Sequence, residues 1–342
     1  MTEFMDQKPF IVAELSGNHN HALDRALALV DSAAAAGAHA VKLQTYTPDT
    51  LTLDSDKPEF VLQAGPWAGQ RLYDLYAVGS LPWDWHAPLF DRAREKGVKI
   101  FSAPFDFSAV DFLETLDCPA YKIASPEVID LPLIRHAAST GKPIIISTGM
   151  ATLAEIDAAV DAAKTGGAGK VTLLHCISAY PTPAAKMRLG NVSALQARYP
   201  GVSIGLSDHS MGNAIALAAI ALGAELVEKH FTLARADGGI DSEFSMEPAE
   251  LETLVREAAD VYQSTQSAQF GPGEAESASL QFRRSLYVVA DMRAGDIFTR
   301  ENLRSVRPAL GLSPALMDQV LGKPALKDIP LHTPLDTTMV AL

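Results

Sequence analysis

The sequence has few of the features that mark secreted, membrane-bound or nucleic-acid-binding proteins. Cys118 and Cys176 are its two cysteines in 342 residues. We interpret them as buried thiols of a reducing compartment, because a disulfide framework needs more cysteines in a chain of this size. No basic segment followed by an apolar run appears at the start, and the longest apolar window, residues 214–224, is too short to span a bilayer. These absences predict a cytoplasmic protein without a membrane partner.

Excess positive charge is also missing. The formal net charge is -13, and no basic cluster offsets it. This argues against a nucleic-acid partner, although a local pocket in an acidic protein can still be positive. The composition is 48% hydrophobic and 20% charged, with a mean hydropathy of +0.08. These values predict a globular enzyme with a large core, and the length allows one large domain and a small one.

Eight short apolar runs recur along the chain, and each is followed by an amphipathic stretch that has the pattern of a helix. This alternation predicts a parallel sheet, and eight repeats are the number that closes a (β/α)₈ TIM barrel. An open doubly wound sheet is the alternative, but no G-x-G-x-x-G motif opens the first helix. The runs cover residues 10–16, 40–46, 99–105, 120–125, 143–149, 170–176, 203–209 and 226–232.

The domain organisation follows from a change in composition near residue 265. We expect a TIM-barrel catalytic domain over residues 1–264, a Gly-, Ser- and Glu-rich linker over 265–282, and a small β-rich domain over 283–342. Two connections in the barrel, 47–83 and 177–190, are too long for plain turns. Both follow strands, so they should lie at the carboxyl end of the barrel, where barrel enzymes build their active sites.

Polar residues gather at the ends of the predicted strands, where a sheet buried on both faces would otherwise carry Val, Ile and Leu. Residues i and i+2 share a face of a strand, so Lys42 and Gln44 point the same way, as do Ser207 and His209. Some of these side chains could be ordinary satisfied core groups, but the whole set indicates a polar site. Its members are Glu14, Lys42, Gln44, Ser102, Lys122, Ser125, Ser147, Thr148, His175, Ser178, Ser207, Asp208, His209, Glu228 and His230.

Three chemical groups stand out within this set. The two lysines Lys42 and Lys122, with serine hydroxyls, suit a phosphate dianion. His209 and His230, on adjacent strands, are suited to a divalent cation with open coordination positions, and two histidines alone do not distinguish manganese from other metals. Glu14 is suited to general acid or base catalysis.

With these residues identified, the chain resembles the sialic acid synthase family over essentially its whole length. The motifs that carry the resemblance are AELSGNHN, VKLQTY, AYKIAS, IISTGMAT, LLHC-x3-YPTP, GLSDHS and EKHFT, and the tail resembles the family's antifreeze-like (SAF) domain. The resemblance implies condensation of phosphoenolpyruvate (PEP) with an acylamino sugar aldehyde, which yields a nine-carbon 2-keto sugar acid and phosphate.

Within the family, the sequence is most similar to the branch that forms pseudaminic acid. SGNHN stands where the neuraminate-forming branch commonly has G-x-NHNG, and LARADGGIDSEFSMEP replaces a Gly-Pro-Asp stretch. Ser178 stands where that branch often has Asn. The acceptor implied is 2,4-diacetamido-2,4,6-trideoxy-β-L-altropyranose, and N-acetylneuraminate or legionaminate synthesis from another acylamino sugar is the alternative.

The resemblance also implies a role for each site residue. Glu14, His209 and His230 are expected to be catalytic, and the two histidines to hold a divalent metal, with Mn²⁺ expected and Mg²⁺ or Co²⁺ as alternatives. PEP is expected to bind Lys42, Lys122, Ser125, Ser147, Ser178 and Ser207. The sugar is expected to bind Asn18, Gln44, Tyr180, Asp241 and Arg307.

The tail of family members packs over the barrel mouth of the partner chain, so a domain-swapped homodimer is expected, with Arg307 reaching the partner's sugar. Two other interpretations remain. A Schiff-base aldolase would use Lys42, Lys122 or Lys229 and need no metal. A non-catalytic carbohydrate-binding protein would use the tail for recognition but leave the polar strand ends unexplained.

Overall fold

The computed structural model describes residues 4–65 and 67–342, and it divides the chain into two compact units, Met1–Ser267 and Ala268–Leu342. Residues 1–3 belong to the start of the chain, whose sequence predicts no secretory signal. Pro66 belongs to the predicted long connection 47–83. Both lie outside the described part of the chain.

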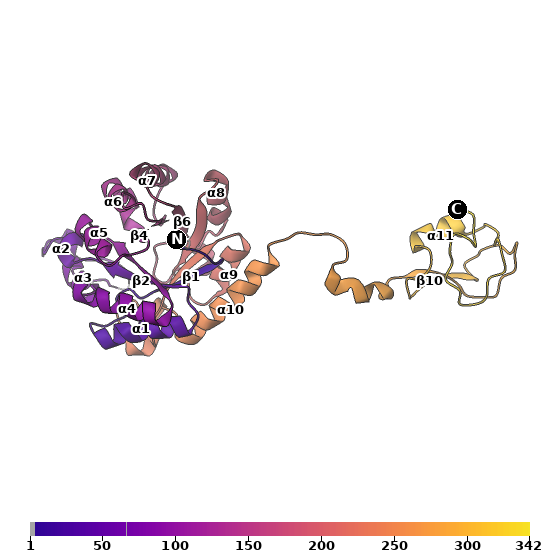
Figure 1. The fold of residues 1–342 in the computed structure, drawn as a ribbon, viewed down its shortest axis with the longest axis horizontal. Coiled ribbons are helices and arrows are strands. Elements are labelled where there is room, and N and C mark those ends of the chain that lie inside the picture. Colours follow the sequence, from indigo (N-terminus) through magenta and orange to yellow (C-terminus); the bar gives the residue numbers. More distant parts are fainter. Residues whose placement is uncertain (1–3, 66) are drawn as a thin grey trace. The chain divides into compact units, whose positions relative to one another are not determined.

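The first unit is a closed eight-stranded parallel barrel, which confirms the predicted TIM-barrel class (Figure 1). Each strand pairs with the next along the chain, and β8 pairs with β1 through partners such as Glu14 and His230. The strands are short and consist of buried residues almost throughout, as expected when helices cover the outer face. They are β1 (Phe10–Glu14), β2 (Ala40–Thr45), β3 (Lys99–Pro104), β4 (Tyr121–Ile123), β5 (Ile144–Ser147), β6 (Val171–Cys176), β7 (Ser203–Asp208) and β8 (Leu226–His230).

Helices surround the strands and end where the sequence provides stop signals. Thr152 and Glu155 form a capping box at the start of α7, and Gly97 and Gly167 adopt left-handed conformations after α4 and α7. The helices of this unit are α1 (Leu23–Ala35), α2 (Pro48–Leu51), α3 (Leu72–Gly79), α4 (His86–Lys96), α5 (Phe107–Glu114), α6 (Leu131–Ala138), α7 (Leu153–Gly166), α8 (Gly190–Arg198), α9 (Ala214–Ala221) and α10 (Pro248–Ser264).

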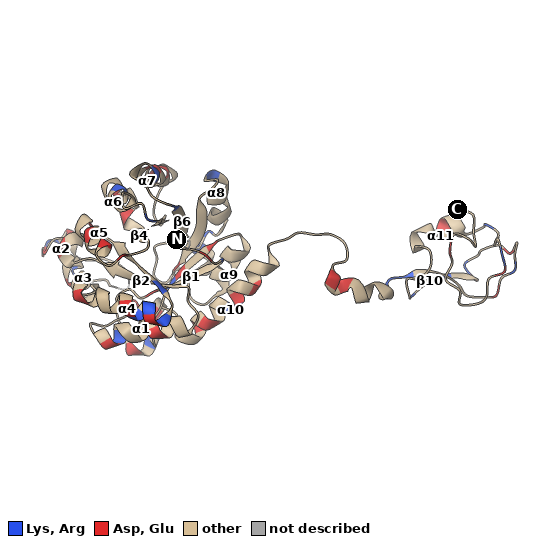
Figure 2. Ribbon diagram, in the orientation of Figure 1, with Lys and Arg blue, Asp and Glu red and all other residues tan. Residues whose placement is uncertain are grey.

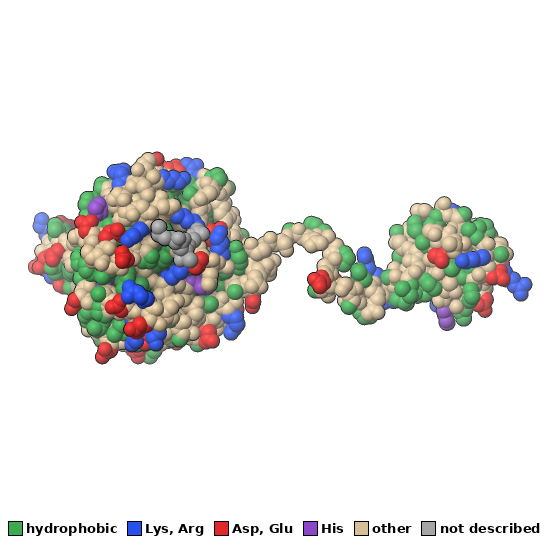
Figure 3. All heavy atoms as spheres, viewed as in Figure 1, with side chains coloured by type: hydrophobic (Ala, Val, Ile, Leu, Met, Phe, Trp, Pro, Cys, Tyr) green, Lys and Arg blue, Asp and Glu red, His purple; other side chains and the backbone are tan. Residues whose placement is uncertain are grey.

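The outer surface of the barrel unit is mixed in charge. Acidic and basic residues alternate along outer helices such as α1 and α4 (Figure 2). On the face drawn in Figure 3, Lys and Arg side chains lie among Asp and Glu side chains. Within the described residues, no helix combines the length and the apolar character needed to cross a membrane.

The second unit has its own small hydrophobic core. The antiparallel strands β9 (Ser285–Val288) and β10 (Leu303–Val306) pair through partners such as Leu286 and Ser305, and α11 (Met317–Val320) is a single turn. Leu286, Val288 and Phe298 are buried in this core. The predicted β-rich character is confirmed. A 3₁₀ helix, Glu274–Phe282, falls within the predicted linker.

Candidate active site

Glu14 is the centre of a buried polar cluster at the carboxyl ends of the strands. The register places it beside Lys42 on β2 and beside His230 on β8. One carboxylate oxygen pairs with the Lys42 ammonium, and the other accepts a hydrogen bond from Gln44 Nε2 at 2.9 Å. Burial raises the pKa of Glu14, although the Lys42 charge opposes this shift. The carboxylate is therefore held in one orientation and is poised to take up a proton more readily than an exposed one.

Two lysines face each other across a second carboxylate. Glu228 Oε1 lies 3.6 Å from the Nζ atoms of both Lys42 and Lys122, which come from different strands. The lysines are 3% and 2% exposed. Burial lowers the pKa of Lys122, and the Glu228 charge offsets this only in part. For Glu228, burial acts to raise the pKa, but the two lysines outweigh it and the pKa is lowered. The Glu228 charge thus favours the ammonium form of both lysines, with the pKa of Lys42 raised and that of Lys122 lowered.

Serine hydroxyls converge on the same end of the barrel. Ser125 Oγ accepts a hydrogen bond from the Gly149 amide at 3.1 Å. A Cβ at Gly149 would lie 2.4 Å from Ser178 Oγ and 2.6 Å from Ser125 Oγ, so only glycine lets both hydroxyls approach. The buried hydroxyls of Ser147 and Ser178 have no hydrogen-bond partner among the described residues. Unpaired buried donors of this kind fit a ligand that supplies acceptors.

His209 and His230 lie side by side, with ring centroids 5.4 Å apart. His209 Nδ1 donates a hydrogen bond to the Ile177 carbonyl at 2.9 Å. In this tautomer the lone pair of the ring is on Nε2, the nitrogen that could bind a metal. His230 Nδ1 is buried without a hydrogen-bond partner in the described structure, and it lies 3.9 Å from Asp241 Oδ2. The two imidazole rings are therefore neighbours, and a carboxylate oxygen lies near one of them.

This donor set fits a divalent metal. Burial lowers the pKa of His230 well below its usual value, so the ring is neutral, as a ligand must be. Burial acts in the same direction on His209, but Cys176 and the Ile177 carbonyl outweigh it and raise the pKa. Within the described residues, no group of three or more His, Cys, Asp and Glu side chains is arranged to hold a metal. The fit therefore rests on two histidines with open positions between them, a type of site that leaves room for substrate.

Aromatic rings form one wall of the site. Tyr180 lies 4.3 Å from the His209 ring, and Phe244 lies 5.1 Å from both Tyr180 and His230, measured between centroids. Trp67 extends this wall at 5.6 Å from Tyr180, and its indole N–H donates to the Ile240 carbonyl at 3.1 Å. A cavity of about 360 Å³ opens behind Trp67 and Phe244. The wall thus extends from the histidine pair to a recess lined by both apolar and polar side chains.

Two predicted sugar residues have different surroundings. Asp241 accepts a hydrogen bond from Ser16, and burial raises its pKa. Asn18 is fully buried, and its amide donates to the Phe231 carbonyl and to Ser245 Oγ, both at 2.9 Å. These bonds tie the segment after β1 to the loop after β8, so Asn18 holds the loop that carries Asp241.

Several polar strand ends lie outside the cluster and have partners in the fold. The Ser102 hydroxyl bonds Thr45, the Thr148 hydroxyl bonds the Leu174 carbonyl, and His175 Nε2 bonds the Met187 carbonyl. Asp208 and Lys229 pair with each other on the outer faces of their strands, so Lys229 is removed from the barrel interior. These residues are the satisfied core groups that the sequence allowed for.

Some residues of the site were not assigned a role from the sequence. Glu228 was among the polar strand ends, and alternation along β8 places it on the same face as His230, but this pattern does not report its distance to the lysines. Glu127 follows β4, and burial raises its pKa to about 7. Trp67 and Phe244 come from loops, where no periodic pattern indicates direction.

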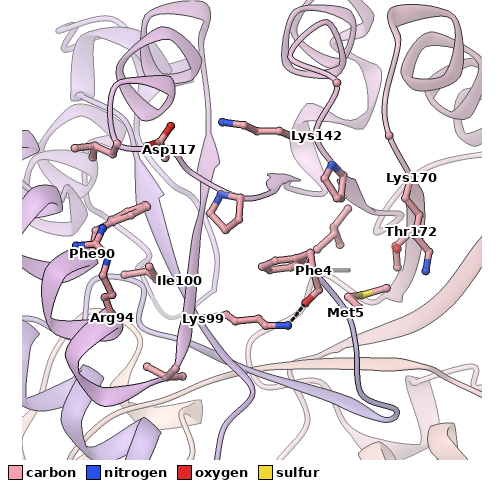
Figure 4. Close-up of a pocket in the computed structure, with 17 residues that line it drawn as sticks. Phe4, Met5, Phe90, Arg94, Lys99, Ile100, Asp117, Lys142, Lys170 and Thr172 are labelled. Carbon is pink, nitrogen blue, oxygen red and sulfur yellow. Dashed lines mark hydrogen bonds between the residues drawn. The ribbon is translucent and has the colours of Figure 1, made fainter. Parts of the chain in front are cut away.

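A second cavity, of about 830 Å³, opens at the opposite end of the barrel, where the strands begin (Figure 4). Lys99 from its lining donates to the Phe4 carbonyl at 2.6 Å, and Lys142 pairs with Glu114 at 2.5 Å. This cavity lacks the converging hydroxyls and histidines, so we place the active site at the carboxyl end of the strands.

Arg307 belongs to the second unit. It is exposed and directly follows β10.

A TIM barrel with two buried lysines, unpaired serine hydroxyls and a histidine pair defines an enzyme that acts on a small anionic substrate. Family comparison agrees with this class. Residues 29–269 match the NeuB family and residues 283–341 match the SAF domain, so the chain belongs to the NeuB family. Synthases of this family are generally metal-dependent.

Individual relatives give a finer comparison. The chain is 40% identical to a pseudaminic acid synthase from Campylobacter jejuni strain 81-176, over 95% of this chain and 94% of the relative. It is 40% identical to the pseudaminic acid synthase of Helicobacter pylori, over 97% of each chain. The solved structure of an N-acetylneuraminic acid synthetase from Leptospira borgpetersenii is 32% identical, with a TM-score of 0.72 over 81% of this chain and 92% of that one. The predicted family and branch are confirmed.

The buried lysines generate a prediction about anion binding. Lys122→Met should weaken the binding of PEP by about 2–5 kcal/mol, because one charge of a desolvated cluster is removed. Titration calorimetry measures this directly. Lys142→Met, at the opposite end of the barrel, is the matched control and should leave the affinity unchanged. Equal PEP affinity in both variants would remove Lys122 from the site.

Proposed function

We propose that this protein condenses PEP with 2,4-diacetamido-2,4,6-trideoxy-β-L-altropyranose and water to give pseudaminic acid and phosphate. The observation that carries the proposal is the buried cluster of Lys42, Lys122 and unpaired serine hydroxyls beside the histidine pair. The relatives named pseudaminic acid synthase, at 40% identity over nearly the whole chain, support the choice of acceptor.

In this proposal PEP lies at the base of the barrel mouth. Lys42 and Lys122 neutralise its charge, and the hydroxyls of Ser125, Ser147, Ser178 and Ser207 donate to its oxygens. The carboxylates that pair with the lysines keep both ammonium groups oriented before the anion arrives. Less reorganisation is then needed at the moment of binding.

The sugar reacts in its open-chain form. The C3 carbon of PEP attacks the aldehyde carbon, water adds at C2, and the C2–O bond to phosphate then breaks to leave the 2-keto acid. His209 and His230 would hold a divalent metal, which would supply Lewis-acid polarisation of the aldehyde. Glu14 is positioned to handle a proton of the water or of the new hydroxyl, and Glu127, with a pKa near neutrality, is a second candidate for proton exchange. Holding two small molecules in contact should supply much of the rate.

The acceptor's apolar end is assigned to the aromatic wall. Trp67 and Phe244 border a recess that also has Leu75, Val78 and Ile240 in its lining, beside the polar Gln70 and Glu243, and the 6-methyl group is assigned to its apolar part. Such surroundings favour the 6-methyl group over a hydroxyl. Gln44, Tyr180 and Asp241 are the proposed polar partners of the sugar, and Asn18 acts through the loop that it holds.

Two alternatives are weaker. A Schiff-base aldolase requires a lysine free to attack a carbonyl, whereas Lys42 and Lys122 face carboxylates and Lys229 lies on the outer face of β8. A carbohydrate-binding protein would have no use for the buried lysine pair. Use of another acylamino sugar by the same chemistry remains the alternative that the assay must address.

The direct test is an activity assay. Purified protein with PEP, Mn²⁺ and the trideoxy acceptor should release phosphate and form a product with the mass of pseudaminic acid. Chelation should abolish phosphate release, and added Mn²⁺ should restore it. His209→Ala should stay folded but inactive. Faster turnover of N-acetylmannosamine would reassign the acceptor, and full activity in chelator would exclude the metal.

The aromatic wall generates a prediction about selectivity. Trp67→Ala should lower kcat/KM for the trideoxy acceptor by roughly 10-fold or more, since one methyl contact in an apolar pocket is worth about 10–200-fold. It should change kcat/KM for N-acetylmannosamine less. Phe107→Ala, which removes an exposed ring stacked on His136 on the outside of the barrel, is the control. A uniform loss for both sugars would count against the assigned recess.

We further propose that the protein works as a homodimer in which Arg307 completes the partner's site, as its guanidinium can donate to an acetamido carbonyl. Mixing inactive Glu14→Ala chains with inactive Arg307→Ala chains should then restore part of the activity, because a hybrid dimer contains one intact site. Subunit exchange is checked by mass-tagged chains. Exchange without recovered activity would place Arg307 in its own chain's site or in none.

A further inference from the structure

The last cross-strand pair between β7 and β8 joins Asp208 to Lys229 in register. Both side chains are buried, with exposed fractions of 1% and 3%, and Lys229 Nζ lies 2.7 Å from Asp208 Oδ2. Side chains alternate along a strand, so this pair lies on the outer face, while His209, directly after β7, and His230, the last residue of β8, face the site. The ion pair and the histidine pair are therefore one residue apart on both strands.

The hydrogen bonds of this ion pair involve the residues on both sides of His209. Lys229 Nζ also donates to the Ser210 carbonyl at 2.7 Å, and Asp208 Oδ1 accepts from the Ser210 amide at 2.8 Å. Asp208 and Ser210, on either side of His209, thus both bond the Lys229 ammonium. Lys229 in turn directly precedes His230. We name these bonds among Asp208, Ser210 and Lys229 the β7–β8 clamp.

We propose that the β7–β8 clamp is a positioning device that sets the distance between the His209 and His230 rings and thereby the affinity for the divalent metal. Backbone bonds hold each histidine to other loops, from Thr182 N to His209 O and from Met246 N to His230 O, both within 2.9 Å. Those bonds anchor each histidine separately. The clamp couples the two strand ends directly, at the last pair of the β7–β8 ladder.

A buried ion pair is not explained by stability alone. Well-packed apolar residues of similar volume often stabilise a fold as well or better, so a role in positioning is the reason we assign to this pair. A site built from two histidines has few ligands to correct a misplaced ring. Groups that orient metal ligands typically change metal affinity by about 10–100-fold when they are removed.

The test measures Mn²⁺ binding by titration calorimetry without substrates, at a temperature where circular dichroism shows the native fold. Asp208→Asn and Lys229→Met should each raise the Kd for Mn²⁺ by about 10-fold or more. The double variant Asp208→Leu/Lys229→Met removes both charges, so it can fold even where a single variant leaves one charge buried alone. It should show the same weakened binding. Lys229→Arg, which keeps the charge, should recover part of the affinity.

The control is the Lys142–Glu114 pair at the other end of the barrel. Glu114→Gln/Lys142→Met should leave Mn²⁺ affinity unchanged even if it lowers Tm, whereas a general loss of stability would affect both sets alike. Wild-type affinity in the folded double clamp variant would overturn the proposal.

The inference rests on the proposed metal pair, and the same titrations separate the two. If the wild type fails to bind Mn²⁺, or binds it equally well as His209→Ala, the metal assignment itself is wrong. If the wild type binds Mn²⁺ and His209→Ala does not, the metal assignment holds, and the clamp variants then test the clamp alone.

Discussion

The constraint on which this structure depends is the burial of unlike charges inside a closed barrel. Two ammonium groups taken out of water would be very unfavourable alone, and the carboxylates of Glu14 and Glu228 beside them make their burial tolerable. These four side chains come from β1, β2, β4 and β8, so the barrel must close with the observed register for the charges to meet. Fold and chemistry are thus specified by the same contacts.

The need to pair buried charges also explains where the polar groups of the site lie along the barrel axis. Apolar residues fill the first half of β1 and begin β2 and β8, and the charges and imidazoles of the site lie nearer the carboxyl ends of these strands. Loops that follow the strands add the aromatic wall and Asp241. The charged residues on the strands therefore lie below residues supplied by loops. These loops can differ among family members while the charged residues on the strands stay in place.

Much of the fold and part of the site could be predicted from the sequence. The eight apolar runs matched the strands, because buried parallel strands read as continuous apolar segments. Alternation correctly paired Lys42 with Gln44 on one face. The role of Glu228 was missed because its meaning depends on lysines from two other strands, and no local pattern reports such distances. Trp67 and Phe244 lie on loops whose direction is set by tertiary packing. Conversely, Ser102 and His175 looked like site residues but bond to neighbours outside the interior.

The segment from Glu228 to His230 shows how little room the architecture leaves for length variation. Its successive side chains serve the lysine cluster, the β7–β8 clamp and the histidine pair, on alternating faces of one strand. Insertion or deletion of one residue here would exchange the faces, burying an ammonium group among imidazoles and turning a carboxylate toward the helices. In evolution or in engineered libraries, a change of length in this stretch should therefore be tolerated less well than a substitution at one of its positions.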